Sequence, residues 1–186
     1  MQRLNKEKCL IIIALLVLLF SCHENKIERQ QKEMSQLLKD KQNIMEIREK
    51  NKASVKSFFT ALETKNMNVL LKLFANEAKH INPYHSGIFP EGANGKEEIE
   101  NYWKPVFENF DGMTFPLEYL YAMEDHNMVF VKYKGYIKLK NSSKVYSNEY
   151  YSTFKFNRDG QIIEYVEIFN PILAAKGFGL LGEIQP

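Results

Sequence analysis

The sequence places one carboxylate where it could transfer a proton, Glu167, in an alternating apolar run near the C-terminus. Ile163, Tyr165, Glu167 and Phe169 share one face of a predicted strand over residues 162–169. If that face is turned inward, Glu167 lies among aromatic side chains, where a carboxyl group can donate or accept a proton near neutral pH. A glutamate paired with Lys or His at the rim of a sheet would show the same pattern, so a structural role stays open.

A second set of polar residues lies in and just after the first predicted strand. His80, Asn82 and Tyr84 alternate along the chain, so they would share a strand face and could converge on a ligand, and His85 follows directly. Because histidine titrates near neutral pH, His80 or His85 could exchange a proton with Glu167. Single histidines are also often structural, so neither interpretation is excluded.

Other kinds of chemistry find little support in the residue pattern. His80 and His85 have no acidic residue near them at a spacing that suits a metal ion. The sequence contains no nucleophile elbow, phosphate-binding loop or dinucleotide fingerprint. We therefore expect neither a metal nor a cofactor.

The first 21 residues have the three-part pattern of a signal peptide. A basic stretch with Arg3, Lys6 and Lys8 precedes an apolar run from Cys9 to Phe20. This run is shorter than the roughly 20 residues that span a bilayer. We therefore expect residues 1–21 to be a removable signal and not a permanent membrane span.

The apolar run ends in Leu19-Phe20-Ser21-Cys22, which resembles the processing site of bacterial lipoproteins. Cys9 would be removed with the signal, so Cys22 would be the one cysteine left and no disulfide could form. We predict an envelope lipoprotein, anchored through acyl chains such as palmitate on Cys22, with its folded part at the periplasmic or outer-membrane face. A secreted chain with a free thiol is the alternative.

Beyond the signal the chain divides into a tether, one domain and a short tail. Residues 22–49 are rich in Lys, Glu and Gln and lack Gly and Pro, which predicts a charged helical tether. Residues 50–181 form the domain, and residues 182–186 form the tail. Without residues 1–21 the acidic and basic side chains are equal in number, so we expect no nucleic-acid partner.

Hydrophobic periodicity predicts helices in the first half of the domain and strands in the second. Helices are expected over 50–65, 66–75 and 96–109, with a kink or break at Pro105. The first has an apolar face of Val55, Phe58, Phe59 and Leu62, and the third carries Tyr102 and Trp103 on one side. Short strands are expected over 78–84, 114–123, 128–139, 146–156 and 162–169, with Tyr133 on the apolar face of the third.

This order of elements predicts an α+β domain whose helices cover one face of a bent sheet of four to six strands. The last four strands are joined by short, turn-rich connections, so we expect them to pair in sequence as an antiparallel meander. The last strand is apolar on both faces, and such strands are usually covered on both sides. A homodimer through the outer face of the sheet is therefore predicted.

Residues 50–181 resemble the nuclear transport factor 2-like superfamily and, within it, the SnoaL-like group. Two local motifs are similar to its phenazine biosynthesis A/B branch: Gly95-Lys96-Glu97-Glu98-Ile99 and Glu167-Ile168-Phe169-Asn170-Pro171. The resemblance implies a cone of about three helices packed on a strongly bent antiparallel sheet, and it implies Glu167 as the acid/base group. Around it we expect a pocket wall of polar and aromatic side chains: Asn82, Tyr84, His85, Asn94, Tyr102, Trp103 and Tyr133.

Two functions follow from this resemblance. In the first, the cone binds a small apolar or aromatic molecule without converting it. In the second, an isomerase or dehydratase uses Glu167 as general acid or base, with His80 as its partner. Asn94 stands where the phenazine branch has a histidine, and asparagine can hold a ligand but cannot transfer a proton. This departure favours binding, whereas Glu167 among aromatic residues favours catalysis.

Overall fold

The computed structural model describes the backbone of residues 2–140 and 145–180 and the side chains of residues 26–140 and 145–180. The chain forms two compact units, Met1–Ile44 and Met45–Pro186. The first unit belongs to helix α1 (Gln2–Glu63), which continues into the second. The predicted lipidation site, Cys22, and the predicted tail 182–186 lie outside the described side chains.

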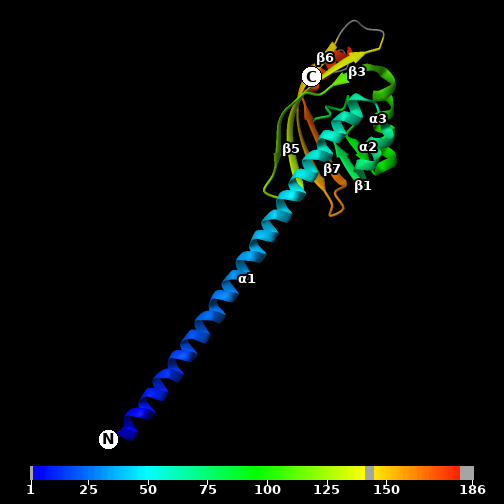
Figure 1. Cartoon of the computed structure of the whole chain (residues 1–186). Helices are drawn as coiled ribbons and strands as arrows, with labels where there is room; N and C mark the ends of the chain where they lie inside the picture. Colours follow the sequence, from blue (N-terminus) through cyan, green and yellow to red (C-terminus); the bar gives the residue numbers. More distant parts are fainter. Residues whose placement is uncertain (1, 141–144, 181–186) are drawn as a thin grey trace. The chain divides into compact units, whose positions relative to one another are not determined.

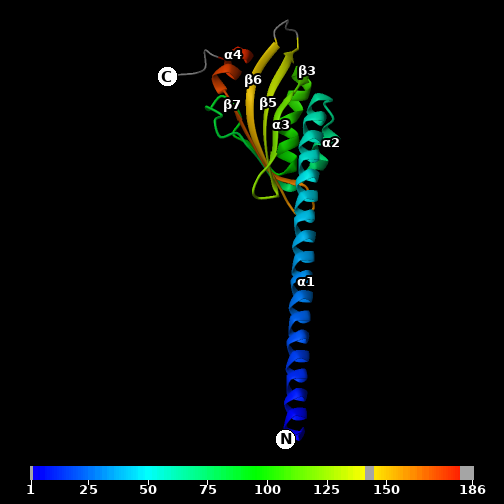
Figure 2. The same ribbon diagram turned by 60° about the vertical axis from the view of Figure 1, so that its left-hand side comes forward.

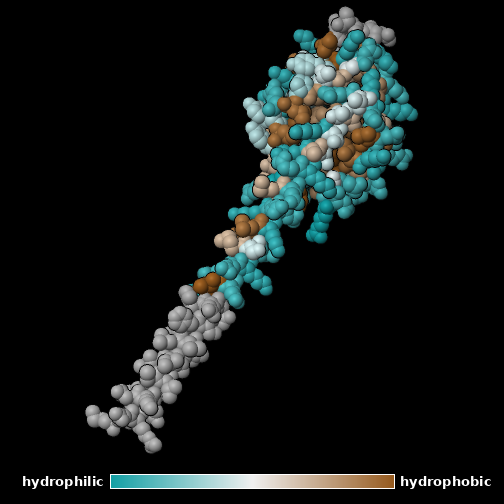
Figure 3. Space-filling model, in the orientation of Figure 1, coloured by the Kyte–Doolittle hydropathy of each residue, from teal (hydrophilic) through white to brown (hydrophobic). Residues whose placement is uncertain are grey.

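Where its side chains are described, from residue 26 onward, the first unit is a polar helix with scattered apolar side chains. Ile27, Met34, Leu37 and Leu38 are exposed, and Figure 3 shows apolar atoms among hydrophilic ones on its visible face. Over the residues that the structure describes, no helix combines the length and the hydropathy needed to cross a membrane.

In the second unit, helices pack on one side of a curled sheet (Figures 1 and 2). The C-terminal part of α1 lies there with α2 (Met67–Leu73) and α3 (Lys96–Asn109), and α4 (Pro171–Phe178) follows the last strand. Asparagine side chains cap the N-termini of α2 and α4. Asn66 accepts a hydrogen bond from the backbone amide of Val69, and Asn170 accepts hydrogen bonds from the amides of Ile172 and Leu173.

The sheet has seven strands in the order β2-β1-β7-β6-β5-β3, and β4 also pairs with β5. The strands are β1 (Phe74–Ile81), β2 (Gly92–Asn94), β3 (Phe110–Thr114), β4 (Leu117–Ala122), β5 (Met128–Leu139), β6 (Val145–Phe156) and β7 (Ile162–Phe169). The predicted meander is confirmed, because β4, β5, β6 and β7 pair antiparallel in sequence order.

The sheet differs from our prediction in direction and in number of strands. It is mixed and not purely antiparallel, because β1 and β7 pair in parallel, with His80 opposite Tyr165. The strand predicted over 114–123 is two strands, β3 and β4. Pro116 lies between them, and proline has no N–H to donate to a ladder.

The helix boundaries also differ in two places. Helix α2 ends at Leu73 and β1 begins at once with Phe74, although we predicted a helix to residue 75 and a strand over 78–84. Helix α3 runs through Pro105 to Asn109 without the predicted break. Trp103 and Val106 pack on the core on either side of this proline and hold the helix in place.

The core between helices and sheet is rich in aromatic rings. The predicted apolar face of α1 is confirmed, since Val55, Phe58, Phe59 and Leu62 are all buried. The ring of Phe58 contacts those of Phe154 and Tyr165 across the core, with centroids 5.1 and 4.9 Å away. These contacts fix the sheet against the helix and so position the inward face of β7.

Candidate functional site

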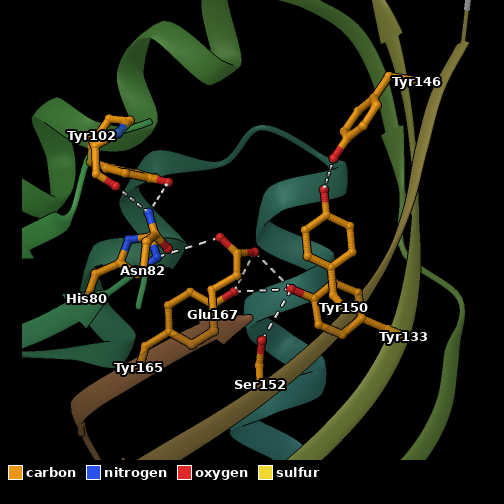
Figure 4. Close-up of polar contacts among 10 residues, drawn as sticks. His80, Asn82, Tyr102, Tyr133, Tyr146, Tyr150, Ser152, Tyr165 and Glu167 are labelled. Carbon is orange, nitrogen blue, oxygen red and sulfur yellow. Dashed lines mark hydrogen bonds and ion pairs between the residues drawn. The ribbon is translucent and has the colours of Figure 1, made fainter. Parts of the chain in front are cut away.

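The inward face of the sheet carries a buried carboxylate, Glu167, held by two tyrosines (Figure 4). Its Oε1 accepts hydrogen bonds of 2.9 Å from the hydroxyls of both Tyr133 and Tyr165. The Tyr133 hydroxyl also lies 3.4 Å from Oγ of Ser152. Both phenol protons are therefore directed at one oxygen of this carboxyl group.

The pairing of β5, β6 and β7 brings Glu167 together with Tyr133, Tyr165 and Ser152. Tyr165 and Glu167 are two residues apart on β7 and therefore share a face. Ser152 of β6 is paired with Glu167, and Tyr133 of β5 lies on the next strand along. The cluster therefore spans three adjacent strands, none of which could form it alone.

Burial keeps the tyrosines protonated. It raises the pKa of Tyr133 and of Tyr165 well above the ordinary value, and the negative charge of Glu167 raises both further. Both hydroxyls therefore remain hydrogen-bond donors at neutral pH. Burial raises the pKa of Tyr102 in the same way, with the charge of Glu167 as the second cause.

His80 of β1 lies beside the carboxylate. Its Nε2 is 3.7 Å from Oε2 of Glu167, which is longer than a hydrogen bond. Its ring is stacked on that of Trp103, with centroids 5.7 Å apart, and contacts the ring edge of Tyr102 at 4.4 Å. The side chain is fully buried, and neither ring nitrogen has a hydrogen-bond partner among the described residues.

Two further polar atoms near His80 are buried without a partner in the described part of the chain. Asn82 donates through Nδ2 to the carbonyl of Pro90, at 2.9 Å, and to the hydroxyl of Tyr102, at 3.0 Å. Its Oδ1 and the indole Nε1 of Trp103 have no hydrogen-bond partner. Since buried polar groups are normally paired, such atoms suit a site that is completed by a ligand or water.

Glu167 lines a cavity of about 310 Å³ between α3, α4 and the sheet. It is the one charged side chain among the described lining residues. The walls are largely aromatic, formed by Phe89, Tyr102, Trp103, Phe110, Phe115, Tyr146, Tyr150, Phe169 and Phe178. At the end of the cavity away from His80, the hydroxyls of Tyr146 and Tyr150 lie 3.1 Å apart (Figure 4).

Residues 55–165, most of the second unit, match the SnoaL-like domain family. The chain belongs to this family. A curated relative, the uncharacterized protein YesE of Bacillus subtilis strain 168, is 24% identical over 131 residues, which cover 70% of this chain and 88% of YesE.

Solved structures show the same fold for this SnoaL-like domain. A proposed isomerase from Bacillus subtilis matches with a TM-score of 0.65 and 24% identity, over 71% of this chain and 94% of that protein. A phenazine biosynthesis-related protein from Pseudomonas aeruginosa matches with a TM-score of 0.64 and 17% identity, over 76% and 86%. The predicted α+β, nuclear transport factor 2-like cone is therefore confirmed.

The SnoaL-like domain brings some of the predicted site residues together and leaves others apart. Glu167, His80, Asn82, Tyr102, Trp103 and Tyr133 form one connected cluster. Tyr84 is 59% exposed, because β1 ends at Ile81 and the predicted alternation stops there. His85 lies 3.7 Å from Glu91 at the surface, and Asn94 is exposed; neither lines the cavity.

Two features of the site were missed from the sequence. A bulge in the β6–β7 pairing buries Ile162 and leaves Ile163, predicted to point inward, half-exposed. Tyr146 and Tyr150 of β6 line the far end of the cavity with Phe178 of α4. The two tyrosines lie four apart on one strand face, which is a signal that could have been used.

Chemically, the cluster can accept a hydrogen bond or a proton at Oε2 of Glu167. The described residues contain no group of three or more His, Cys, Asp or Glu side chains that could hold a metal ion. The aromatic walls supply apolar contact area. The arrangement suits a small ligand with one polar end.

Proposed function

We propose that this SnoaL-like domain binds a small, largely apolar or aromatic molecule in the cavity beside Glu167. The observation that carries this proposal is a cavity of about 310 Å³ with aromatic walls and a single carboxylate. Ligand sites are typically concave, mostly apolar and provided with a few polar groups that fix orientation. The apolar part of the ligand packs on the walls, and its polar end meets Oε2 of Glu167.

The hydrogen bonds to Glu167 favour binding over proton transfer. Two phenol donors occupy Oε1 of Glu167 and leave Oε2 as the oxygen that can meet a ligand. The hydroxyls of Tyr133 and Tyr165 lie 3.2 Å apart, and each donates its single proton to Glu167. They are therefore not free to stabilise charge on a reacting substrate.

An enzyme of the isomerase or dehydratase kind is the second candidate. The 3.7 Å separation of Oε2 of Glu167 and Nε2 of His80 supports it, because a proton could pass between them with a small movement. In this reaction Glu167 removes a proton from one carbon of the substrate and returns it to another, or to a leaving hydroxyl.

The test uses two neutral probes, ethylbenzene and benzyl alcohol, and the fluorescence of Trp103. Trp103 is the one tryptophan of the chain and lines the cavity, so bound probe should change its emission directly. We expect saturable binding and a higher Tm with wild type, with Glu167→Gln, and with the control Glu164→Gln on the same strand. Absence of saturation with both probes contradicts the binding proposal.

The Glu167→Gln variant distinguishes ligand binding without turnover from catalysis. Binding of neutral probes should persist in Glu167→Gln, since the substitution keeps the shape of the side chain. If the domain is an enzyme, turnover of its substrate should fall by about two orders of magnitude or more, the usual contribution of a general acid or base.

We further propose that the domain is carried on an envelope lipoprotein anchored through Cys22. The support comes from the sequence: a basic stretch, a short apolar run, and a small residue directly before the cysteine. The polar helix that follows would then separate the domain from the membrane.

A further inference from the structure

The charges around the cavity point to a narrower class of ligand. Given the proposed function, that the cavity binds a small molecule, we infer that its preferred ligand is a small organic cation, such as a protonated amine on an aromatic or aliphatic frame. Three observations carry this inference: the acidic and basic residues of the lining, the hydrogen bonds made by Glu167, and the aromatic side chains of the walls.

The described lining of the cavity contains one acidic side chain and no basic one. Among the described residues that line the cavity, Glu167 is charged and no Lys, Arg or His is present. The nearest basic group to Oε2 is His80, at 3.7 Å, and it lies behind the wall formed by Tyr102 and Trp103. An anionic ligand would be buried next to a like charge, which is costly, whereas a cation supplies the missing partner.

The hydrogen bonds made by Glu167 leave one of its two oxygens open to a ligand. Tyr133 and Tyr165 both donate to Oε1, and both stay protonated at neutral pH. Oε2 receives no hydrogen bond from either tyrosine and is left to accept one from a ligand. A charged N–H donor gives a stronger bond to this oxygen than a neutral hydroxyl does.

The walls are made of the groups that bind organic cations well. A cation within about 6 Å of an aromatic face is attracted by the electrons of the ring, most strongly by tryptophan and tyrosine. Trp103, Tyr102 and Tyr150 all line the cavity. The ring of Tyr133 stacks on one face of the Tyr150 ring, with centroids 4.9 Å apart. That face of Tyr150 is therefore covered, and a ligand would contact another side of the ring.

The volume limits the size of the cation. About 310 Å³ lies at the lower end of the range for ligand sites, roughly 300 to 1,000 Å³. A single aromatic ring with an aminomethyl group fits that space. A long peptide would not be enclosed by it.

The experiment compares four probes that share one ring and differ in charge. Benzylamine is a cation, ethylbenzene is its neutral isostere, benzyl alcohol is a neutral donor and benzoate is an anion. Binding to the full chain is measured at neutral pH by Trp103 fluorescence and by thermal shift. We expect benzylamine to bind about tenfold or more tightly than ethylbenzene, as a charge-assisted hydrogen bond would give, and benzoate to bind most weakly.

Variants at Glu167 test whether the preference for a cation depends on the charge of this side chain. In Glu167→Gln, benzylamine should lose its advantage and bind within about threefold of ethylbenzene, because the charge-assisted bond is gone. Glu167→Asp keeps the carboxylate and should retain part of the preference for benzylamine over ethylbenzene. This second variant keeps the test decisive if Glu167→Gln does not fold. The control Glu164→Gln should behave as wild type.

The outcomes separate this inference from the proposed function. Equal affinity of wild type for benzylamine and ethylbenzene, or tightest binding of benzoate, overturns the cation preference while leaving small-molecule binding intact. A cation preference that persists in Glu167→Gln also overturns it. If no probe binds, the proposed function fails and the inference fails with it.

Discussion

The hydroxyls of Tyr133 and Tyr165 meet at a single oxygen of Glu167, and each donates a hydrogen bond to it. Tyr165→Phe removes one of these donors, so Glu167 should be held less firmly in place. We expect benzylamine affinity to fall by about three- to tenfold, which corresponds to the usual contribution of one hydrogen bond. Ethylbenzene affinity should not change.

Fluorescence titration of Trp103 measures both affinities. Tyr121→Phe is the matched control, because Tyr121 is exposed and does not line the cavity. An equal loss for both probes would mean that Tyr165 acts through packing and not through Glu167.

Which site residues could be foreseen depended on how regular the chain is around them. Glu167 and Tyr165 could be placed on one inward face because their part of β7 keeps strict alternation. Tyr84 could not be placed, because alternation says nothing about where a strand ends. Ile163 could not be placed either, because one extra residue in a bulge reverses the faces before it.

At the level of elements, α4 packs unusually closely on β6. A Cβ added at Gly177 would lie 2.3 Å from the ring of Tyr146, which lines the cavity. Gly177→Ala should therefore displace α4 or Tyr146, lower the free energy of unfolding by about 1–3 kcal/mol, and weaken binding of ethylbenzene. Urea denaturation and fluorescence titration measure the two effects.

The control for this prediction is Gly112→Ala, since a Cβ at Gly112 meets nothing within 4 Å. An unchanged urea midpoint in Gly177→Ala would show that α4 can move without cost. The helix would then contribute little to the stability of the domain.

The strands β4, β5 and β6 are joined by an ion network on the outer side of the sheet. Nζ of Lys132 lies 3.0 Å from Glu118 and 3.1 Å from Glu149. Hydrogen bonding from Lys132 and Lys134 lowers the pKa of Glu118, and bonding from Tyr151 and then Lys132 lowers that of Glu149. Carboxyl groups with a lowered pKa stabilise the fold above their ordinary pKa, and this contribution is lost as the pH falls through the lowered value.

Lys132→Met should therefore make stability less sensitive to acid. We expect its Tm to be lower than that of wild type at pH 7 and the difference to shrink as the pH falls below the ordinary carboxyl value of about 4.5. Thermal unfolding followed across this range measures it. A constant difference in Tm at every pH would show that the lysine acts through its apolar stem alone.

Local signals also explain which elements could be predicted. Short connections indicated the meander of β4 to β7, because two strands joined by a tight turn have few other ways to pair. The parallel pairing of β1 with β7 joins residues such as His80 and Tyr165, and no local pattern records so distant a partner. Strand β2 has three residues, too few for a period to be visible.

For the whole molecule, the proposed lipid attachment at Cys22 can be tested directly. We expect labelled palmitate to enter the full chain in a bacterial host and to be lost in Cys22→Ser. The protein should move from the membrane to the soluble fraction with it. Cys9→Ser is the control, since that residue would be removed with the signal. Labelling that persists in Cys22→Ser contradicts lipid attachment at this position.

A homodimer through the outer face of the sheet remains a prediction. Several large side chains on the described strands are exposed: Tyr119, Tyr121, Tyr136, Tyr151 and Ile168. Tyr119 and Tyr121 stack on each other with centroids 5.8 Å apart. Aromatic side chains are enriched where protein surfaces associate, and light scattering would give the mass in solution.

The parallel contact of β1 with β7 also has a kinetic consequence. It brings His80 next to the carboxylate from a distant part of the chain. Closing so long a loop costs entropy before its contacts form, so we expect the contacts around the cavity to be absent from the folding transition state. A bound ligand should then slow unfolding and leave the folding rate unchanged, because it stabilises contacts that the transition state lacks. Stopped-flow measurements with and without ligand would show one arm of the chevron moving while the other stays in place.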